Sequence, residues 1–393
     1  MSPAPLRINA FTASSAAGKG VKATLEALRS RKSGLTPNDF GTRPVDTYIG
    51  RVGGVETTPL PPHLKQWECR NNSLAWLGLN QDGFIAAVSA ARERYGSTRV
   101  AVVFGTSTSS IGATEEAYAN LDGANRFPTH LRNPLIHTPH STGEFVQRAL
   151  ELEGVCITVA TACSSSAKVF GQAQRLISSG VADAAVVGGT DSLCGSVLFG
   201  FNSLELVSGE PCRPFDASRS GINLGEAAGF ALLERDGPGP ALLGYGESSD
   251  AFHMSSPHPE GLGARKAIDA ALARAGMTAD AVDYINLHGT ASRKNDEVEA
   301  KVIGDLFGAD ALASSTKGWT GHTLGAAGIL ESVITLLALE HSMAPGTLNA
   351  MQLDSVCGPQ IRIENTDASL RTGMSLSFGF GGSNCALLFG RGE

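Results

Sequence analysis

The chain has 393 residues, of which 42% are hydrophobic and 18% are charged, and its mean hydropathy is close to zero. These values are typical of a soluble globular protein, and they exclude a fibrous or intrinsically disordered chain. The net charge of −7 has the wrong sign for a protein whose main partner is a nucleic acid.

Short apolar runs alternate with longer amphipathic stretches along the chain, a pattern typical of an α/β protein with buried sheets. Strands are predicted at Leu6–Phe11, Val100–Thr106, Val155–Ala160, Ala184–Gly189, Ala228–Leu233, Val282–Leu287, Met374–Phe378 and Cys385–Phe389. Helices are predicted at Val21–Arg29, Ser73–Arg94, Thr142–Leu152, Ser164–Ser179, Gly263–Ala275, Asp296–Phe307 and Leu324–Leu339.

The loop Asp236–Pro240, Asp-Gly-Pro-Gly-Pro, divides the sequence into halves 1–238 and 239–393. Each half has a strand that leads through a polar turn into a long helix of small residues. The first turn contains Cys163, and the second runs from Thr316 to His322. This parallel predicts an internal duplication.

Seven cysteines are scattered along the chain with no C-x-x-C pair, which argues against a disulfide framework and a zinc site. The amino-terminal sequence lacks the order of a signal peptide, and no apolar run is expected to span a bilayer. We therefore expect a cytoplasmic protein with no membrane or nucleic-acid partner.

Cys163 is the strongest candidate nucleophile. It lies in Thr-Ala-Cys-Ser-Ser-Ser, directly after a predicted buried strand and at the start of a helix. The positive end of the helix dipole favours a thiolate there, and the small neighbours allow a tight turn. Most single cysteines are small buried hydrophobic residues instead, which is the interpretation we give to Cys156, Cys194 and Cys385.

His288 and His322 are candidate partners of this cysteine. His288 ends a predicted strand, where α/β proteins place their sites, and His322 lies at the start of the second glycine-rich helix. Two neutral imidazoles can donate hydrogen bonds to one developing oxyanion. Taken singly, each histidine is more often structural, and a metal site is the weaker alternative because no ligand pair stands at i, i+4.

Two further features lie in the second half of the chain. Lys317 and Glu331 frame its helix, either as a surface ion pair or as buried electrostatic support. The turn Gly379–Asn384 follows a strand and could present a free backbone amide to a substrate oxygen. It lacks the Lys-Ser/Thr of a nucleotide P-loop.

The order of these motifs resembles that of the β-ketoacyl-acyl-carrier-protein synthases of the elongating type, in the thiolase-like superfamily. The motifs are Thr161-Ala-Cys-Ser-Ser-Ser166, Cys212-Arg-Pro-Phe-Asp216, Gly225-Glu226, His288-Gly-Thr290, Ser315-Thr-Lys317, Gly321-His322 and Gly379-Phe-Gly-Gly-Ser-Asn384. The resemblance spans nearly the whole chain and is weaker before Tyr95.

The resemblance implies an α/β, five-layered αβαβα fold of two similar halves and a Cys-His-His centre. By motif position, Cys163 is the acyl-accepting nucleophile, His288 and His322 act in decarboxylation and condensation, and Lys317 and Glu331 support them. Further matches are Phe380, whose amide completes an oxyanion hole with that of Cys163 and whose ring gates the pocket, and Thr290 and Ser292, which bind the phosphopantetheine arm.

The implied activity is a decarboxylative condensation of an acyl thioester with malonyl-acyl carrier protein, which needs no metal or other cofactor. The implied partners are acyl carrier protein and a second subunit, in a homodimer or heterodimer. A thiolase and a non-catalytic chain-length-factor subunit are the alternatives. The thiolase would need a second cysteine in the carboxyl-terminal turn, and the non-catalytic subunit would normally lack the nucleophile.

Departures from the family's motifs, among them a Gly225-Glu-Ala-Ala stretch in place of a more glycine-rich one, leave the subfamily open between fatty-acid and polyketide or polyene synthesis. Ser292 stands where the family has threonine, and Arg293 and Lys294 after it add positive charge beside the arm-binding pair. The amino-terminal strand also lacks the common Thr-Gly-x-Gly turn. For carrier docking, an acidic chain needs a local basic patch, and the resemblance places similar basic residues around the pocket mouth. The residues assigned to it are Lys65, Arg70, Arg126 and Arg132.

Overall fold

The computed structural model describes residues 4–42 and 44–392, and its centre is a mixed sheet of 11 strands. These strands are β1 (Leu6–Ser15), β2 (Gly18–Lys19), β5 (Val100–Gly105), β6 (Cys156–Val159), β7 (Ala184–Asp191), β9 (Ala227–Glu234), β10 (Ala241–Ser249), β11 (Tyr284–Asn286), β12 (Leu312–Ser314), β15 (Thr372–Gly379) and β16 (Ser383–Gly390). Their order is β12-β11-β15-β16-β10-β1-β9-β7-β5-β6, and β2 pairs with β1.

The sheet is made of two halves with the same topology. Numbered along the chain, the five main strands of each half lie in the order 3-2-4-5-1. In both halves the third, second and fourth strands are parallel, and the fifth is antiparallel to the fourth and to the first. This confirms the predicted internal duplication. The predicted boundary at 238/239 falls in the loop between β9 and β10.

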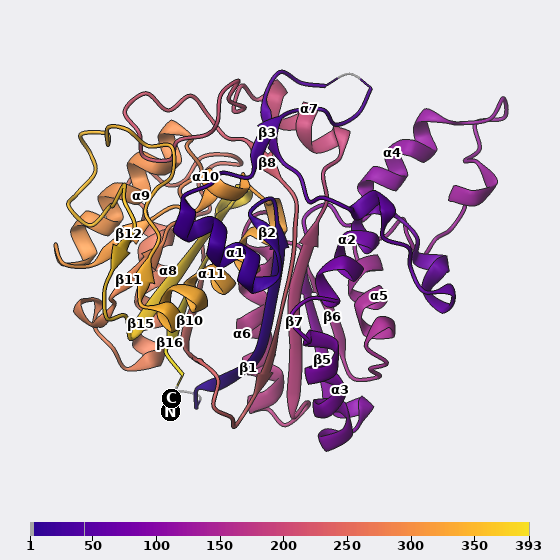
Figure 1. Ribbon diagram of the computed structural model, residues 1–393, viewed down its shortest axis with the longest axis horizontal. Helices are drawn as coiled ribbons and strands as arrows, with labels where there is room; N and C mark the ends of the chain where they lie inside the picture. Colours follow the sequence, from indigo (N-terminus) through magenta and orange to yellow (C-terminus); the bar gives the residue numbers. More distant parts are fainter. Residues whose placement is uncertain (1–3, 43, 393) are drawn as a thin grey trace.

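Helices cover both faces of each half-sheet and also fill the space between the two (Figure 1). They are α1 (Gly20–Ser30), α2 (Arg70–Leu79), α3 (Phe84–Tyr95), α4 (Ile111–Ala119), α5 (Ser141–Ala149), α6 (Ser165–Ser178), α7 (Gly195–Ser203), α8 (Leu262–Ala275), α9 (Arg293–Leu306), α10 (Lys317–Thr320) and α11 (Ala327–His341). The central layer is α6 and α11; α2, α3 and α5 cover one outer face, and α8 and α9 cover the other. The predicted five-layered fold is confirmed.

The two halves are joined mainly through the central helices. The strands β1 and β10 pair at only two positions, Leu6 with Leu242 and Arg7 with Ala241. The helices approach closely instead, because a Cβ on Gly328 would lie 2.4 Å from the backbone nitrogen of Ala167. This packing brings the turn before α6 close to the turn before α11.

The segment Leu324–His341, which includes α11, is long and apolar enough to cross a membrane by length and composition. The sequence-based expectation that no segment would pass this test is therefore wrong. However, 89% of this segment is buried inside the protein, between the two half-sheets. Its apolar character is accounted for by its place in the core.

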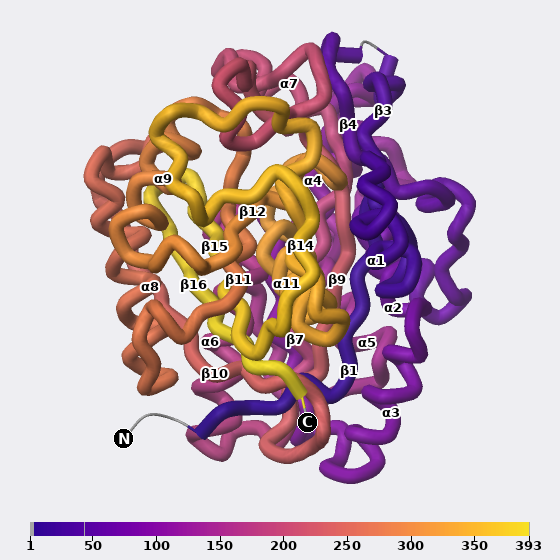
Figure 2. Tube along the Cα trace, turned by 60° about the vertical axis from the view of Figure 1, so that its left-hand side comes forward, coloured from indigo at the N-terminus to yellow at the C-terminus, as the bar shows by residue number. Residues whose placement is uncertain are grey.

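Some predicted elements differ from the structure. The single helix expected at Ser73–Arg94 is two helices, α2 and α3, because Asp82 and Gly83 adopt positive φ angles between them. The sequence also missed β10, α4, α7 and α10. The remaining short strands, which were not predicted, are β3 (Leu35–Pro37), β4 (Tyr48–Gly50), β8 (Leu224–Gly225), β13 (Met343–Ala344) and β14 (Thr366–Asp367). Figure 2 shows β3 and β4 beside α7 at the end of the molecule opposite the last residues of β16.

Candidate active site

Cys163 lies in a strained turn between β6 and α6. The preceding residue, Ala162, has a φ of 51°, which residues other than glycine rarely adopt. Local hydrogen bonds hold this conformation, because the hydroxyl of Ser164 donates to the carbonyl of Thr161 (2.9 Å) and that of Ser165 donates to Ala162 (2.6 Å). The turn is the elbow expected from the small residues around the cysteine.

The two histidines come from the second half of the fold and meet the cysteine. His288 follows β11, and His322 follows α10. The Nε2 of His322 lies 2.9 Å from the Sγ of Cys163. The two imidazole rings are perpendicular, with their centroids 5.4 Å apart. The structure therefore brings together the three side chains predicted to be catalytic.

The glycine turn after β15 also lies close to the cysteine. A Cβ on Gly379 would lie 2.8 Å from the carbonyl oxygen of Thr161, so only glycine fits there. Burial raises the pKa of the Cys163 thiol, and the next amide, that of Phe380, interacts with this thiol and partly opposes the rise. The ring of Phe380 packs against that of Phe201, with centroids 5.5 Å apart. Phe380 and Cys163 line the same cavity, and the roles of Phe380 as oxyanion donor and gate stay predictions.

Lys317 forms a buried ion pair with Glu331, and its ammonium also donates to the backbone carbonyl of His288. Burial and the positive charge of Lys317 lower the pKa of His288 and of His322 well below 6.5. Both imidazoles are therefore neutral at pH 7, as hydrogen-bond donors to an oxyanion should be. Of the two interpretations given for Lys317 and Glu331, a surface ion pair or a buried one, the buried pair is the one found.

The thiol of Cys163 does not have the low pKa expected from its place at a helix start. Burial raises the pKa to about 11, although Lys317 and the amide of Phe380 act in the opposite direction. The resting group is consequently a thiol at pH 7. Its proton can pass to Nε2 of His322 when a substrate arrives, because the two atoms are already in contact.

Two residues that the sequence reasoning missed hold the histidines through their backbones. The carboxylate of Glu299 on α9 accepts hydrogen bonds from the amides of His288 and Gly289, both at 2.7 Å. The carbonyl of Asn223 accepts from the amide of His322 at 2.7 Å. Glu299 could have been noticed as a carboxylate on the apolar, buried face of the helix predicted at Asp296–Phe307. For Asn223, we find no such signal.

A cavity of about 570 Å³ leads from the surface to Cys163, and both histidines line it. Thr290 and Ser292 line it as well, and their hydroxyls are hydrogen-bonded to each other at 2.9 Å. The volume falls in the range of small-molecule sites. The cavity thus contains the predicted arm-binding pair, although binding of the arm stays a prediction.

The four basic residues predicted to dock a carrier protein do not line this cavity; they are Lys65, Arg70, Arg126 and Arg132. Lys65 and Arg70 line a separate groove of about 780 Å³, where the guanidinium of Arg70 is ion-paired with the buried carboxylate of Glu226 (2.6 Å). Arg126 and Arg132 both contact Asp122. None of the four lines the cavity, and three of them are paired within the protein, so their part in carrier docking stays a prediction.

The sulfur of Cys163 and a ring nitrogen from each histidine lie within 4.8 Å of one another, so the donor set by itself also suits a metal ion. The electrostatics of the site favour catalysis by these side chains over metal binding. The ammonium of Lys317 lowers the pKa of both imidazoles, and the same positive charge opposes a bound cation.

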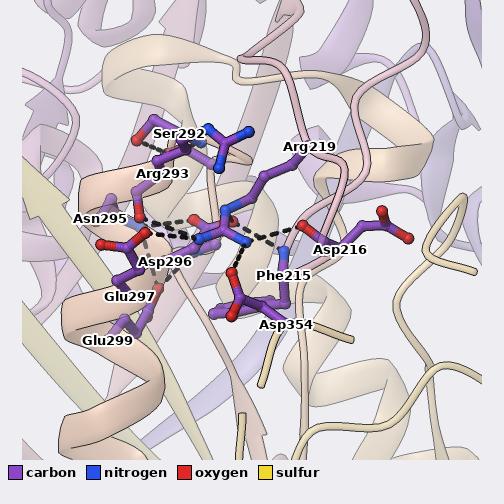
Figure 3. A network of polar contacts seen from close by, with 12 residues as sticks. Phe215, Asp216, Arg219, Ser292, Arg293, Asn295, Asp296, Glu297, Glu299 and Asp354 are labelled. Atoms are coloured by element: carbon purple, nitrogen blue, oxygen red, sulfur yellow. Dashed lines mark hydrogen bonds and ion pairs between the residues drawn. The ribbon is translucent and has the colours of Figure 1, made fainter. Parts of the chain in front are cut away.

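A buried arginine, Arg219, supports the wall of the cavity (Figure 3). Its side chain is fully buried and contacts three carboxylates: Asp354 at 2.7 Å, Glu297 at 3.5 Å and Asp296 at 3.6 Å. Asp296 also accepts a hydrogen bond from the amide of Phe215 (2.9 Å). The network ties the start of α9 to two loops.

Replacing Arg219 by methionine should lower the free energy of unfolding by about 3–5 kcal/mol, because the change leaves buried carboxylate charge without its partner. Denaturant titration monitored by circular dichroism measures the difference. Arg126→Met is the matched control, since Arg126 is exposed and, among the residues that the structure describes, is ion-paired with Asp122 alone. Equal stability of the two variants would show that the network does not support the fold.

Comparison with known proteins identifies matches along most of the chain. Residues 74–237 match the model of the β-ketoacyl synthase amino-terminal domain, and residues 241–351 match that of the carboxyl-terminal domain. The mitochondrial 3-oxoacyl-[acyl-carrier-protein] synthase of Arabidopsis thaliana is 39% identical over 252 residues, 58% of this chain. That match spans only 55% of the length of the plant protein.

Two other similar proteins match over a larger share of their length. Nodulation protein E of Rhizobium meliloti (strain 1021) is 35% identical over 70% of this chain and 72% of its own. A solved structure, the complex of the ketosynthase ApeO with its chain length factor ApeC from Xenorhabdus doucetiae, matches with a TM-score of 0.90. That match has 36% identity and covers 99% of this chain and 98% of the matched one. With the motifs and the site geometry in agreement, this chain belongs to the β-ketoacyl synthase family.

Proposed function

We propose that the protein condenses an acyl thioester with malonyl-acyl carrier protein, with loss of carbon dioxide, to give a 3-oxoacyl-acyl carrier protein. The observation that carries this proposal is the contact of Cys163 with the neutral imidazole of His322, beside His288 and the amide of Phe380. The product serves fatty-acid synthesis or a polyketide or polyene pathway. No cofactor is needed, because decarboxylation drives the reaction.

The first stage is acyl transfer to Cys163. The thiol gives its proton to Nε2 of His322, and the sulfur attacks the thioester carbon. The amides of Cys163 and Phe380 stabilise the resulting oxyanion. When the tetrahedral intermediate collapses, the carbon–sulfur bond to the carrier breaks, and the carrier thiol leaves with a proton.

The second stage uses the histidines as hydrogen-bond donors. His288 and His322 stabilise the enolate oxygen of the malonyl thioester as carbon dioxide leaves, and the new carbanion attacks the acyl group on Cys163. The cysteine sulfur leaves as a thiolate and takes up a proton to restore the resting thiol, and the product is two carbons longer. Lys317 supports this stage by keeping both imidazoles neutral, since its charge lowers their pKa.

The alternatives fit the site less well. A thiolase would need a second reactive cysteine at the cavity, but Cys385 is fully buried in β16 and does not line it. Burial also raises the pKa of the Cys385 thiol. A non-catalytic subunit has no use for the contact between Cys163 and His322, which the chain keeps.

We further propose that the protein works in a dimer with a ketosynthase-like subunit and binds acyl carrier protein. The similar ApeO structure is a complex with a chain length factor, which supports a heterodimer. The partly exposed strand β6 lies at one end of the sheet and offers an edge for pairing with another chain. All seven cysteines are free, which supports a reducing compartment such as the cytoplasm.

Intact-mass analysis tests the proposed function. After incubation with a panel of acyl carrier proteins, the protein should gain one acyl group, located on Cys163 by digestion and sequencing of the peptide. Addition of malonyl carrier protein should then remove the acyl group with release of carbon dioxide. If the acyl group is found elsewhere, or stays in place after malonyl carrier protein is added, the proposal fails.

A further inference from the structure

Three cationic side chains line the cavity: Arg219, Arg293 and Lys294. They differ in charge compensation. Arg219 is buried among three carboxylates, as Figure 3 shows, so its charge is already neutralised. Neither Arg293 nor Lys294 forms an ion pair within residues 4–42 and 44–392, and both are exposed. These two residues therefore supply the free positive charge of the cavity wall.

The two free cations stand directly after the hydroxyl pair of Thr290 and Ser292 in the sequence, on the first turn of α9. The backbone that carries them is fixed, because Nη2 of Arg219 donates to the carbonyl of Arg293 at 3.3 Å. The buried network thus holds the turn in place. A ligand that extends along this wall meets the hydroxyls of Thr290 and Ser292 deeper in the cavity and the two cations nearer the surface.

The carboxylates of the cavity do not cancel this charge. Asp250 is held by the amide nitrogen of Asn384 at 2.9 Å and by the backbone amide of His258 at 3.2 Å. Glu205 is exposed and comes from the turn after α7, a different part of the lining from α9. The first turn of α9 accordingly presents to the cavity two exposed cations that have no ion pair among the described residues, while the carboxylates of Asp296, Glu297 and Asp354 are held by Arg219 behind it.

We propose that Arg293 and Lys294 bind the phosphate of the phosphopantetheine arm that delivers the substrate. The inference rests on the proposed function, and it names the residues that hold the charged end of the arm. A guanidinium fork and an ammonium group suit phosphate oxygens, and the hydroxyls of Thr290 and Ser292 suit the amides nearer the thioester.

The test compares three forms of one acyl substrate: the thioester of pantetheine, that of 4′-phosphopantetheine, and that of the acyl carrier protein. Wild-type protein should use the phosphopantetheine thioester with a kcat/KM at least about 10-fold above that of the pantetheine thioester, because charge-assisted contacts form only with the phosphate. In the double variant Arg293→Gln/Lys294→Gln this preference should disappear through a higher KM. Turnover of the pantetheine thioester should stay unchanged.

Lys301→Gln is the matched control, since Lys301 is an exposed lysine on the same helix that does not line the cavity. It should keep the wild-type preference. If the double variant loses activity only with the carrier-protein substrate, the two cations contact the protein rather than the phosphate, and the inference fails. Equal losses with the pantetheine and phosphopantetheine thioesters also overturn it. If wild-type protein turns over none of the three, the proposed function itself fails.

Discussion

Replacement of Cys163 by alanine should reduce condensation by at least about 10⁴-fold, because no acyl-enzyme can form without the sulfur. The fold should be little affected, since alanine is small and the turn is held by the hydroxyls of Ser164 and Ser165. Product formation from acyl and malonyl carrier proteins, followed by mass spectrometry, measures the loss.

Two further cysteine variants make this result interpretable. Cys163→Gln should still release carbon dioxide from malonyl carrier protein, because its amide imitates the acyl thioester beside intact histidines. Cys69→Ala should keep full activity, since Cys69 lies at the separate groove and not at the cavity. Appreciable elongation by Cys163→Ala would show that another group accepts the acyl chain.

His288→Ala and His322→Ala should each lower carbon dioxide release from malonyl carrier protein by about 10²- to 10³-fold, the usual effect of losing one oxyanion donor. Acyl transfer should separate the two variants. His322 contacts the thiol of Cys163, whose pKa burial raises to about 11, so its loss should slow acylation. His288 has no such contact and should be needed mainly for decarboxylation.

Acyl-enzyme formation and carbon dioxide release must be measured separately for these variants. Phe378→Leu is a suitable control, because Phe378 packs on the ring of His288 at 5.8 Å without a polar group to donate. That control should keep most of both activities. Normal carbon dioxide release in both histidine variants would rule out their proposed role.

The sequence predicted the fold class and the three side chains that meet at the cavity, but it missed some of the elements around them. Cys163 and His288 could be found because each follows a short apolar strand, and the carboxyl ends of such strands meet at one edge. His322 could be found from its glycine-rich turn, which follows the short helix α10. The strand β10 was missed because Gly244 and Gly246 break its apolar pattern. A Cβ at either glycine would lie within 2.2 Å of a carbonyl oxygen of α8, so the packing of that helix requires them.

Long-range electrostatics could not be read from the sequence. Arg70 looked like a surface cation, yet the buried carboxylate of Glu226, 156 positions later in the chain, pairs with it. The thiol of Cys163 was expected to be acidic at its helix start, and burial instead raises its pKa. In both cases the deciding partner or the depth of burial depends on segments that only the folded chain brings together.

The close packing of the two central helices limits which substitutions the protein can tolerate far from its reacting atoms. Cys163 precedes α6 in one half of the molecule, and His322 precedes α11 in the other, so the 2.9 Å contact between them depends on how near these helices lie. Gly328 has no chemical role, yet a single methyl group there would wedge α11 away from Ala167. A substitution at such a position would leave every catalytic motif unchanged and would still separate the nucleophile from its histidine.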